Sequence, residues 1–231
     1  ASVTSEGIVT NTLGTSNFVA GVNAGNSITS GGNYNTVVGD EAGTAITTGD
    51  NNVAVGYTAL DANTTASNNT AMGYAALTAN TTGAGNSAMG GSSLEANTTG
   101  NSNVAVGKDT LKANTTASNN TALGRSALFA NTTGADNTAV GNLSLYTNTT
   151  GTGNVAVGKG ALDANTTANY NTAVGLDALG TNTTGTNNNA FGETALFSNT
   201  TGGNNQAIGR GALEQNTTAS NNSAFGHHAL K

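Results

Sequence analysis

Few residues of this chain belong to types that carry out catalysis, and their spacing does not group them. The two histidines, His227 and His228, are adjacent, and no third metal ligand lies at a zinc-like spacing from them. The acids Asp61, Asp163 and Glu95 stand singly and do not form the Gly-Gly-x-Gly-x-Asp pattern of calcium-binding repeats. We expect solvent-facing side chains at these positions, with no catalytic residue, no metal and no cofactor.

Other kinds of site are excluded by composition. Gly158-Lys159-Gly160 and Gly209-Arg210-Gly211 lack the glycine spacing and the following helix of phosphate-binding loops. The absence of cysteine excludes disulfides and cysteine metal sites. Only 6 Lys and Arg stand against 12 Asp and Glu, which argues against a nucleic-acid partner. No apolar run approaches the roughly 18 residues of a membrane span. The sequence therefore predicts a protein that is not an enzyme.

One chemically suggestive pattern recurs, the triplet Asn-Thr-Thr, which is an acceptor sequence for N-linked glycans. The triplets are compatible with a glycan-coated filament or with turns whose Asn points inward. Ile28 and Ile46 replace the Asn in the two earliest copies, and Ile is accommodated most readily at a buried site. We therefore favour an internal ladder of hydrogen-bonded amides, expect few glycans, and expect the variant Asn131→Leu to fold. The ladder comprises Asn63, Asn80, Asn97, Asn114, Asn131, Asn148, Asn165, Asn182, Asn199 and Asn216.

The triplet belongs to a sequence repeat with a period of 17, which runs from residue 35 to the end of the sequence. Its glycine recurs at every seventeenth position from Gly39 to Gly226 without an insertion. We number the positions of the repeat 1 to 17. The consensus, in order, is Asn, variable, Ala, large apolar, Gly, two variable, small, Leu, two variable, Asn, Thr, Thr, Gly or Ala, two variable. A frame that never slips indicates one turn of chain per copy. Helical hairpin repeats need roughly 33 residues or more.

The repeat predicts an all-β fold, a parallel β-solenoid of the β-roll type with about thirteen rungs: the twelve regular copies and the longer rung before them. Residues 52–56 have the composition of a short strand, residues 58–60 are expected to form a second strand, and the Asn-Thr-Thr-Gly segment is turn chemistry. Rungs about 4.8 Å apart give a rod of roughly 60 Å. The absence of proline is consistent with rungs that all donate backbone N–H groups. We divide the chain into an irregular N-terminal segment with a capping rung, residues 1–34, and a regular solenoid, residues 35–231.

The constant frame also predicts which side chains form the core. The Leu of position 9 forms an unbroken column that must be buried, because in water it would be an extreme apolar patch. Neighbouring strand residues face opposite ways, so either position 3 (Ala) or position 4 (large apolar) points inward. Position 2 includes Asn189 and Gln206 and shares a face with position 4, so we favour Ala inside and an outer apolar stripe at position 4; the reverse is the alternative. The column comprises Leu60, Leu77, Leu94, Leu111, Leu128, Leu145, Leu162, Leu179, Leu196, Leu213 and Leu230.

Short stretches of the repeat resemble known fibrous proteins. Asn-Val-Ala-Val-Gly at 52–56 and 103–107, and Asn-Thr-Ala-Val-Gly at 137–141 and 171–175, resemble the head repeats of YadA-like trimeric autotransporter adhesins, which follow a Ser-Val-Ala-Ile-Gly pattern. With its Ala-Leu-x-x-Asn-Thr-Thr-Gly tail, the repeat is also similar to arrays in phage tail-fibre proteins. The adhesin repeat has a shorter period, and the coiled-coil stalk and membrane anchor of those adhesins are not in this sequence. The resemblance implies a left-handed parallel β-roll, extracellular fibres, adhesion and self-association.

We therefore expect an extracellular structural protein, secreted or at the cell surface, that self-assembles into a fibre or filament with a role in adhesion. A trimeric tail-fibre or adhesin-head segment is the alternative. An ice-binding solenoid is less favoured, because Thr64 and Thr65 are adjacent and would face opposite ways on an extended chain. The expected partners are further copies of the chain, joined head to tail through strand addition, with lateral or trimeric contacts by the outer stripe. The residues assigned to head-to-tail assembly are Ile8, Val9, Leu13 and Leu230.

Overall fold

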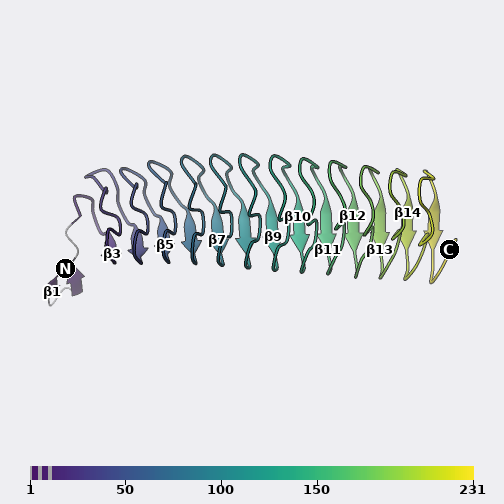
Figure 1. The fold of residues 1–231 in the computed structure, drawn as a ribbon, viewed down its shortest axis with the longest axis horizontal. Coiled ribbons are helices and arrows are strands. Elements are labelled where there is room, and N and C mark those ends of the chain that lie inside the picture. Colours follow the sequence, from purple (N-terminus) through teal and green to yellow (C-terminus); the bar gives the residue numbers. More distant parts are fainter. Residues whose placement is uncertain (1, 5–6, 10–11) are drawn as a thin grey trace.

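The computed structural model describes residues 2–4, 7–9 and 12–231, and within them the chain is an all-β rod without helices (Figure 1). Thirteen strands lie side by side in one parallel sheet, in chain order from β3 (Phe18–Ala20) to β15 (Ser223–Phe225). From β4 onwards, paired residues are one repeat apart in the sequence, as in Ala156↔Ala173. Every repeat position therefore stacks on its own equivalent in the next rung, which confirms the predicted parallel β-solenoid.

The strands are short and evenly spaced. Each is three residues long. Between the two terminal strands of the sheet lie β4 (Thr36–Val38), β5 (Val53–Val55), β6 (Thr70–Met72), β7 (Ser87–Met89), β8 (Val104–Val106), β9 (Thr121–Leu123), β10 (Thr138–Val140), β11 (Val155–Val157), β12 (Thr172–Val174), β13 (Asn189–Phe191) and β14 (Gln206–Ile208).

Each rung contains one strand, and the second strand predicted at residues 58–60 is wrong. Thr58 and Leu60 have φ angles of 52° and 56°, in the left-handed region that an extended strand excludes. The segment nevertheless stays bonded to its neighbours. The Leu60 N–H donates to the carbonyl of Ala76 at 2.9 Å, and the Ala62 N–H donates to the carbonyl of Thr78 at 3.0 Å. The ladder between rungs thus continues through a turn that has no strand geometry.

The interior of the rod is filled by aligned columns of Leu and Ala. The Leu side chains of position 9 are fully buried from Leu60 to Leu196, and Leu213 is 5% exposed. They share one cluster with the Ala side chains of positions 3 and 8. Leu230 differs from the rest of the predicted column, because its side chain is 66% exposed.

The strands resolve which of their two faces is inside. Ala at position 3 is fully buried from Ala54 to Ala207, whereas position 4 is half-buried or exposed. The favoured arrangement is therefore correct, and the alternative with the large side chains inside is excluded. Position 3 faces position 9 across the core. In β4 the larger Val37 is fully buried at position 3 because Gly43 replaces the Leu of position 9, whereas rungs with Leu at position 9 have Ala at position 3.

The N-terminal segment has its own short sheet. β1 (Ser2–Thr4) and β2 (Gly7–Val9) pair antiparallel, with Val3 opposite Ile8, apart from the 13-stranded sheet. The side chains of Ile8 and Val9 lie outside the described part of the structure. Leu13 is 78% exposed. The strand predicted in this segment thus has a partner within the chain.

The buried Leu column yields a direct prediction. Leu128→Asp places an unpaired carboxylate in the middle of the core, and we expect it to lower the free energy of unfolding by several kcal/mol. Leu176→Asp is the matched control, because Leu176 is 42% exposed at position 6 and its replacement should cost less than about 0.5 kcal/mol. Urea or thermal unfolding followed by circular dichroism measures both. Similar stability losses in the two variants would contradict the assignment of the core.

Candidate interaction surfaces and the amide ladders behind them

The Asn residues of position 12 form a continuous hydrogen-bonded ladder inside the rod. The Asn80 Nδ2 donates to the Oδ1 of Asn63 at 3.0 Å, and the same link repeats in every rung up to Asn216, which donates to Asn199 at 2.9 Å. Each Nδ2 also donates to the position-15 carbonyl of its own rung, as from Asn80 to Gly83 at 2.9 Å. The members from Asn63 to Asn199 are fully buried, and Asn216 is half-buried.

A second ladder, which the sequence interpretation missed, is formed by the Asn of position 1. The Oδ1 of Asn35 accepts both from the backbone N–H of Asn52 at 3.0 Å and from its Nδ2 at 3.1 Å. The Nδ2 of Asn52 also donates to the carbonyl of Ala66 at 3.0 Å, and that carbonyl accepts from Asn63 as well. One carbonyl thus joins the two ladders and closes each rung. The sequence did contain a sign of this second ladder, because Asn stands at position 1 in every copy of the repeat.

These hydrogen bonds show which side chains of the Asn-Thr-Thr triplets are free at the surface of the rod. The Nδ2 atoms that would carry glycans already donate within the ladder. The first Thr of the triplet is also engaged, since the Thr98 hydroxyl donates to the carbonyl of Thr115 at 3.0 Å. The second Thr, such as Thr99 or Thr116, is exposed. The folded rod therefore presents one column of threonine side chains and no triplet amide in its regular part.

The outer face of the 13-stranded sheet is the largest candidate interaction surface. It consists of positions 2 and 4 of each rung, and from β4 to β15 neither position carries a charged residue. Position 4 is apolar throughout and substantially exposed. Its most exposed members are Met72, Met89, Val106, Leu123, Phe191, Ile208 and Phe225. We call this surface the sheet face.

The size of the sheet face distinguishes it from ordinary exposed apolar residues. Thirteen strands about 4.8 Å apart, each about 10 Å long, give a flat surface of roughly 600 Å². The largest apolar patch on a typical monomer is about 300–600 Å², and patches at the upper end mark interaction sites. The sheet face is thus large enough for a specific contact.

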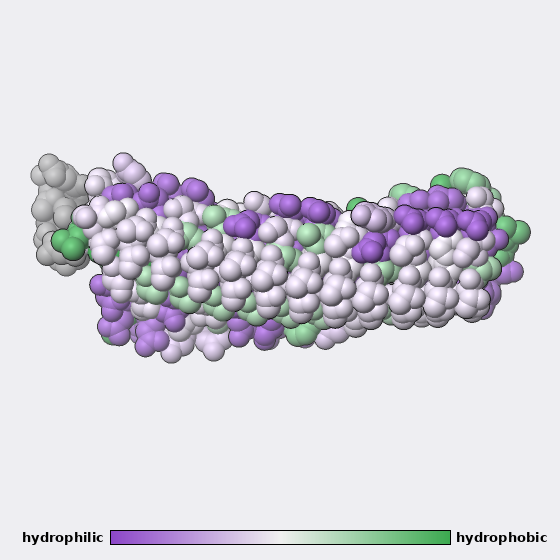
Figure 2. All heavy atoms as spheres, turned by 90° about the horizontal axis from the view of Figure 1, so that it is seen from above, coloured by the Kyte–Doolittle hydropathy of each residue, from purple (hydrophilic) through white to green (hydrophobic). Residues whose placement is uncertain are grey.

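Charged side chains border the sheet face on its two long edges. Position 6, just after each strand, carries exposed charges of both signs: Asp40 near the N-terminal end, Glu193 and Arg210 near the C-terminal end, and between them Lys108, Arg125 and Lys159, which we call the basic rim. The opposite edge, just before each strand, carries the exposed Asp136. Figure 2 views the rod along the strand direction of Figure 1, so it shows the turns at one end of the rungs as regular pale rows, with hydrophilic side chains in patches along both long margins.

A groove on another side of the rod is the second candidate surface. Its volume is about 460 Å³, and it is formed by positions 10 and 11 of four successive rungs. Three alanines line it, together with the ring of Phe129, which stacks on Tyr146 with ring centroids 5.2 Å apart. The full lining is Thr78, Ala79, Glu95, Ala96, Lys112, Ala113 and Phe129. We call this site the mid-rod groove.

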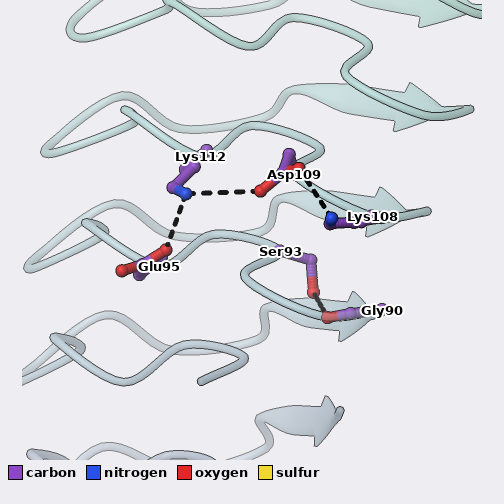
Figure 3. A network of polar contacts seen from close by, with 6 residues as sticks. All are labelled: Gly90, Ser93, Glu95, Lys108, Asp109 and Lys112. Atoms are coloured by element: carbon purple, nitrogen blue, oxygen red, sulfur yellow. Dashed lines mark hydrogen bonds and ion pairs between the residues drawn. The ribbon is translucent and has the colours of Figure 1, made fainter. Parts of the chain in front are cut away.

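A network of ion pairs lies at the mid-rod groove (Figure 3). The Lys112 Nζ is 3.3 Å from the Oε2 of Glu95 and donates to the Oδ1 of Asp109 at 3.3 Å. Lys108 approaches the other oxygen of Asp109 at 3.9 Å. The hydrogen bond to Asp109 raises the pKa of Lys112, with Glu95 adding to the effect, so Lys112 is protonated at neutral pH. Two cations and two anions therefore lie together with no net charge.

The residues first considered for catalysis do not converge. His227 and His228 have ring centroids 4.0 Å apart, and His228 lies 3.8 Å from Glu214. Desolvation lowers the pKa of His228, so it is mostly neutral at pH 7. Burial raises the pKa of Asp163, and the charge of Asp177 adds to this effect. Within the part of the chain that the structure describes, no three His, Asp or Glu residues are placed to hold a metal ion.

Fold and surfaces together define a β-solenoid repeat protein with an uncharged sheet face. Within the described ranges, no helix has the length and apolar character needed to cross a membrane. No protein-family model, curated protein or solved structure matches the chain.

We predict that a substitution in the middle of the position-12 ladder lowers the free energy of unfolding more than one at its first residue. Asn131→Leu leaves the Asn114 Oδ1 without a donor and removes one acceptor from Asn148, for a loss of about 3 kcal/mol. Asn63→Leu removes only the acceptor of Asn80, for about 1 kcal/mol, because Asn63 follows Ile46 and starts the ladder.

We expect both Leu variants to fold, with the lower unfolding midpoint for Asn131→Leu in urea. The two replacements add the same side chain at the same repeat position, so they serve as each other's control. Equal midpoints would show that the amide ladder contributes little to stability.

Proposed function

We propose that the protein is a non-catalytic structural rod of an extracellular fibre, secreted or at the cell surface, and that copies of it associate laterally through the sheet face. The observation that carries this proposal is the uncharged sheet face, with a continuous apolar column at position 4 beside a mostly hydroxyl and amide column at position 2, from β4 to β15. The resemblance to adhesin and tail-fibre repeats supports the extracellular setting and a role in adhesion.

The dimensions of the sheet face suit a partner of the same kind. Two copies packed face to face would bury roughly 1,200 Å² in total, which reaches the range of specific protein interfaces. Interface cores are depleted in charged residues, as positions 2 and 4 are here. A second solenoid also has the same spacing between rungs, so every side chain on one face meets an equivalent environment on the other.

The charges at the edges favour copies that point the same way. If two sheet faces meet with their rods parallel, the basic rim of each lies opposite the edge that carries Asp136. Asp136 precedes β10, between the levels of Arg125 and Lys159, so it would lie between these two cations of the other copy. In the antiparallel arrangement the basic rims of the two copies face each other near the middle of the rods and repel, although Asp40 of each copy then lies at the level of Arg210 of the other. We therefore propose parallel association, as a dimer or a trimer.

Two other modes of action have less support. The strand β2, assigned to head-to-tail addition, pairs with β1 in its own chain and would have to leave this partner to add to another rod. Ice binding would need free threonine hydroxyls. In most triplets the first Thr donates its hydroxyl to a carbonyl of the next rung, so the exposed threonine column is formed by the second Thr. Both remain predictions.

Lateral association is tested by placing charges on the sheet face. We expect the wild-type rod to sediment as a dimer or trimer at micromolar concentration, and the double variant Leu123→Lys/Phe191→Lys to sediment as a monomer with an unchanged melting temperature. Leu176→Lys, which adds charge at exposed position 6 rather than on the sheet face, is the control and should associate like wild type. A monomeric wild type, or a double variant that associates like it, would refute the proposal.

Orientation is tested by cross-linking, which the absence of cysteine makes straightforward. Thr70→Cys in β6 and Thr172→Cys in β12 lie at position 2, three strands on either side of β9, the middle strand of the sheet. With a short bismaleimide, parallel copies should link each variant to itself. Antiparallel copies would link only a mixture of the two variants, which would contradict the proposed orientation.

A further inference from the structure

The mid-rod groove has the size and lining of a small-ligand site. Its volume of about 460 Å³ lies within the roughly 300–1,000 Å³ typical of such sites. Four rungs about 4.8 Å apart make it roughly 15 Å long, enough for two linked sugar rings. The groove is formed by positions 10 and 11, so it is separate from the sheet face at positions 2 and 4.

The walls of the groove suit a ligand that has an apolar face. Ala79, Ala96 and Ala113 offer only methyl groups, and Phe129 offers its ring, held in place by the stack with Tyr146. Flat aliphatic C–H surfaces pack well on methyl groups and aromatic rings. The shape and lining thus select a ligand with a C–H face rather than a fully polar one.

The polar groups of the groove suit a ligand that carries both donors and acceptors but no charge. Glu95 and Asp109 balance Lys108 and Lys112, so the site has no net field that would attract an ion. The Lys112 Nζ lies 3.3 Å from the Glu95 Oε2, which is shielded from solvent, and it donates to the Asp109 Oδ1 at 3.3 Å. An ammonium has three N–H groups, so these two carboxylates leave at most one N–H of Lys112 for a ligand.

Figure 3 shows how these polar groups are presented. The second carboxylate oxygen of Glu95 points away from Lys112, and the Lys112 ammonium lies between Glu95 and Asp109. The side chains of Glu95 and Lys112 are 36% and 37% exposed, and since the Glu95 Oε2 is buried, a bound molecule would reach Glu95 through its other oxygen. Hydroxyl groups, which donate and accept, match this pair of an acceptor and a donor.

From the apolar floor, the aromatic wall and the balanced donor and acceptor groups, we propose that the mid-rod groove binds a neutral carbohydrate, with the sugar ring on Phe129 and the alanines and its hydroxyls on Glu95 and Lys112. No bond is made or broken in this interaction. A carbohydrate site on the side of a rod would give the fibre a means of contact with glycans that does not compete with association through the sheet face.

The test is titration calorimetry with three neutral disaccharides, cellobiose, lactose and N,N′-diacetylchitobiose. It is performed on the Leu123→Lys/Phe191→Lys background, in which binding is measured independently of lateral association. We expect at least one of the sugars to bind saturably with a dissociation constant of about 1 mM or lower. Phe129→Ala should weaken binding by about tenfold, and Glu95→Gln by a few fold.

Matched controls come from the same repeat position in rungs outside the groove. Phe197→Ala and Asp163→Asn change position 10 beyond its lining, and we expect them to leave the dissociation constant unchanged within twofold. Melting temperatures establish that all variants are folded. The proposal is overturned if none of the three sugars binds at about 10 mM, if Phe129→Ala and Phe197→Ala have equal effects, or if decanoate, a charged apolar probe, occupies the groove while the sugars do not.

Discussion

The hydrogen bonds of the carbonyl at position 15 are the interaction on which the rest of the structure depends. That carbonyl accepts hydrogen bonds from the Asn at position 1 and from the Asn at position 12 of the same rung, so it links the first residue of the rung to its Asn-Thr-Thr turn. Each of the two amides is in turn bonded to its equivalent one rung away. A net hydrogen bond is worth about 1 kcal/mol, but a buried amide left without partners costs more than that. Both ladders together occur only where the repeat is 17 residues long. The one rung with an added residue, from Asn17, keeps the position-1 bonds to Asn35 but has Ile28 in place of the Asn of the second ladder.

This constraint explains how much of the fold the sequence could predict. A fixed period implies stacked turns, and the burial of the Leu and Ala columns follows from the constancy of those positions. The turn geometry around Leu60 could not be anticipated, since a left-handed φ is uncommon for a non-glycine residue and Leu gives no sign of it. Burial of the side chain in the core compensates for a backbone conformation that costs about 1–2 kcal/mol.

The candidate surfaces were predictable to different degrees. The sheet face follows from alternation along a strand, once Ala at position 3 is placed inside. The mid-rod groove arises from the variable position 10, where no single rung is informative. Its signal was available, because Glu95 and Lys112 are separated by one repeat and must be neighbours in a stacked fold. The repeat pattern could not show the shape of the groove, because it does not determine how the position-10 side chains Phe129 and Tyr146 stack.

The amide ladders give the rod an inherent polarity. In the position-12 ladder every Nδ2 donates toward the preceding rung, as from Asn80 to Asn63, and at position 1 the N–H groups of Asn52 donate the same way, to Asn35. The side-chain acceptors therefore all face the C-terminal end of the rod. A rung that has formed presents free amide oxygens on the side from which the next residues will come. During synthesis, which proceeds from the N-terminus, each new turn of chain therefore finds a finished template of acceptors, and the solenoid is suited to grow one rung at a time as the ribosome delivers it.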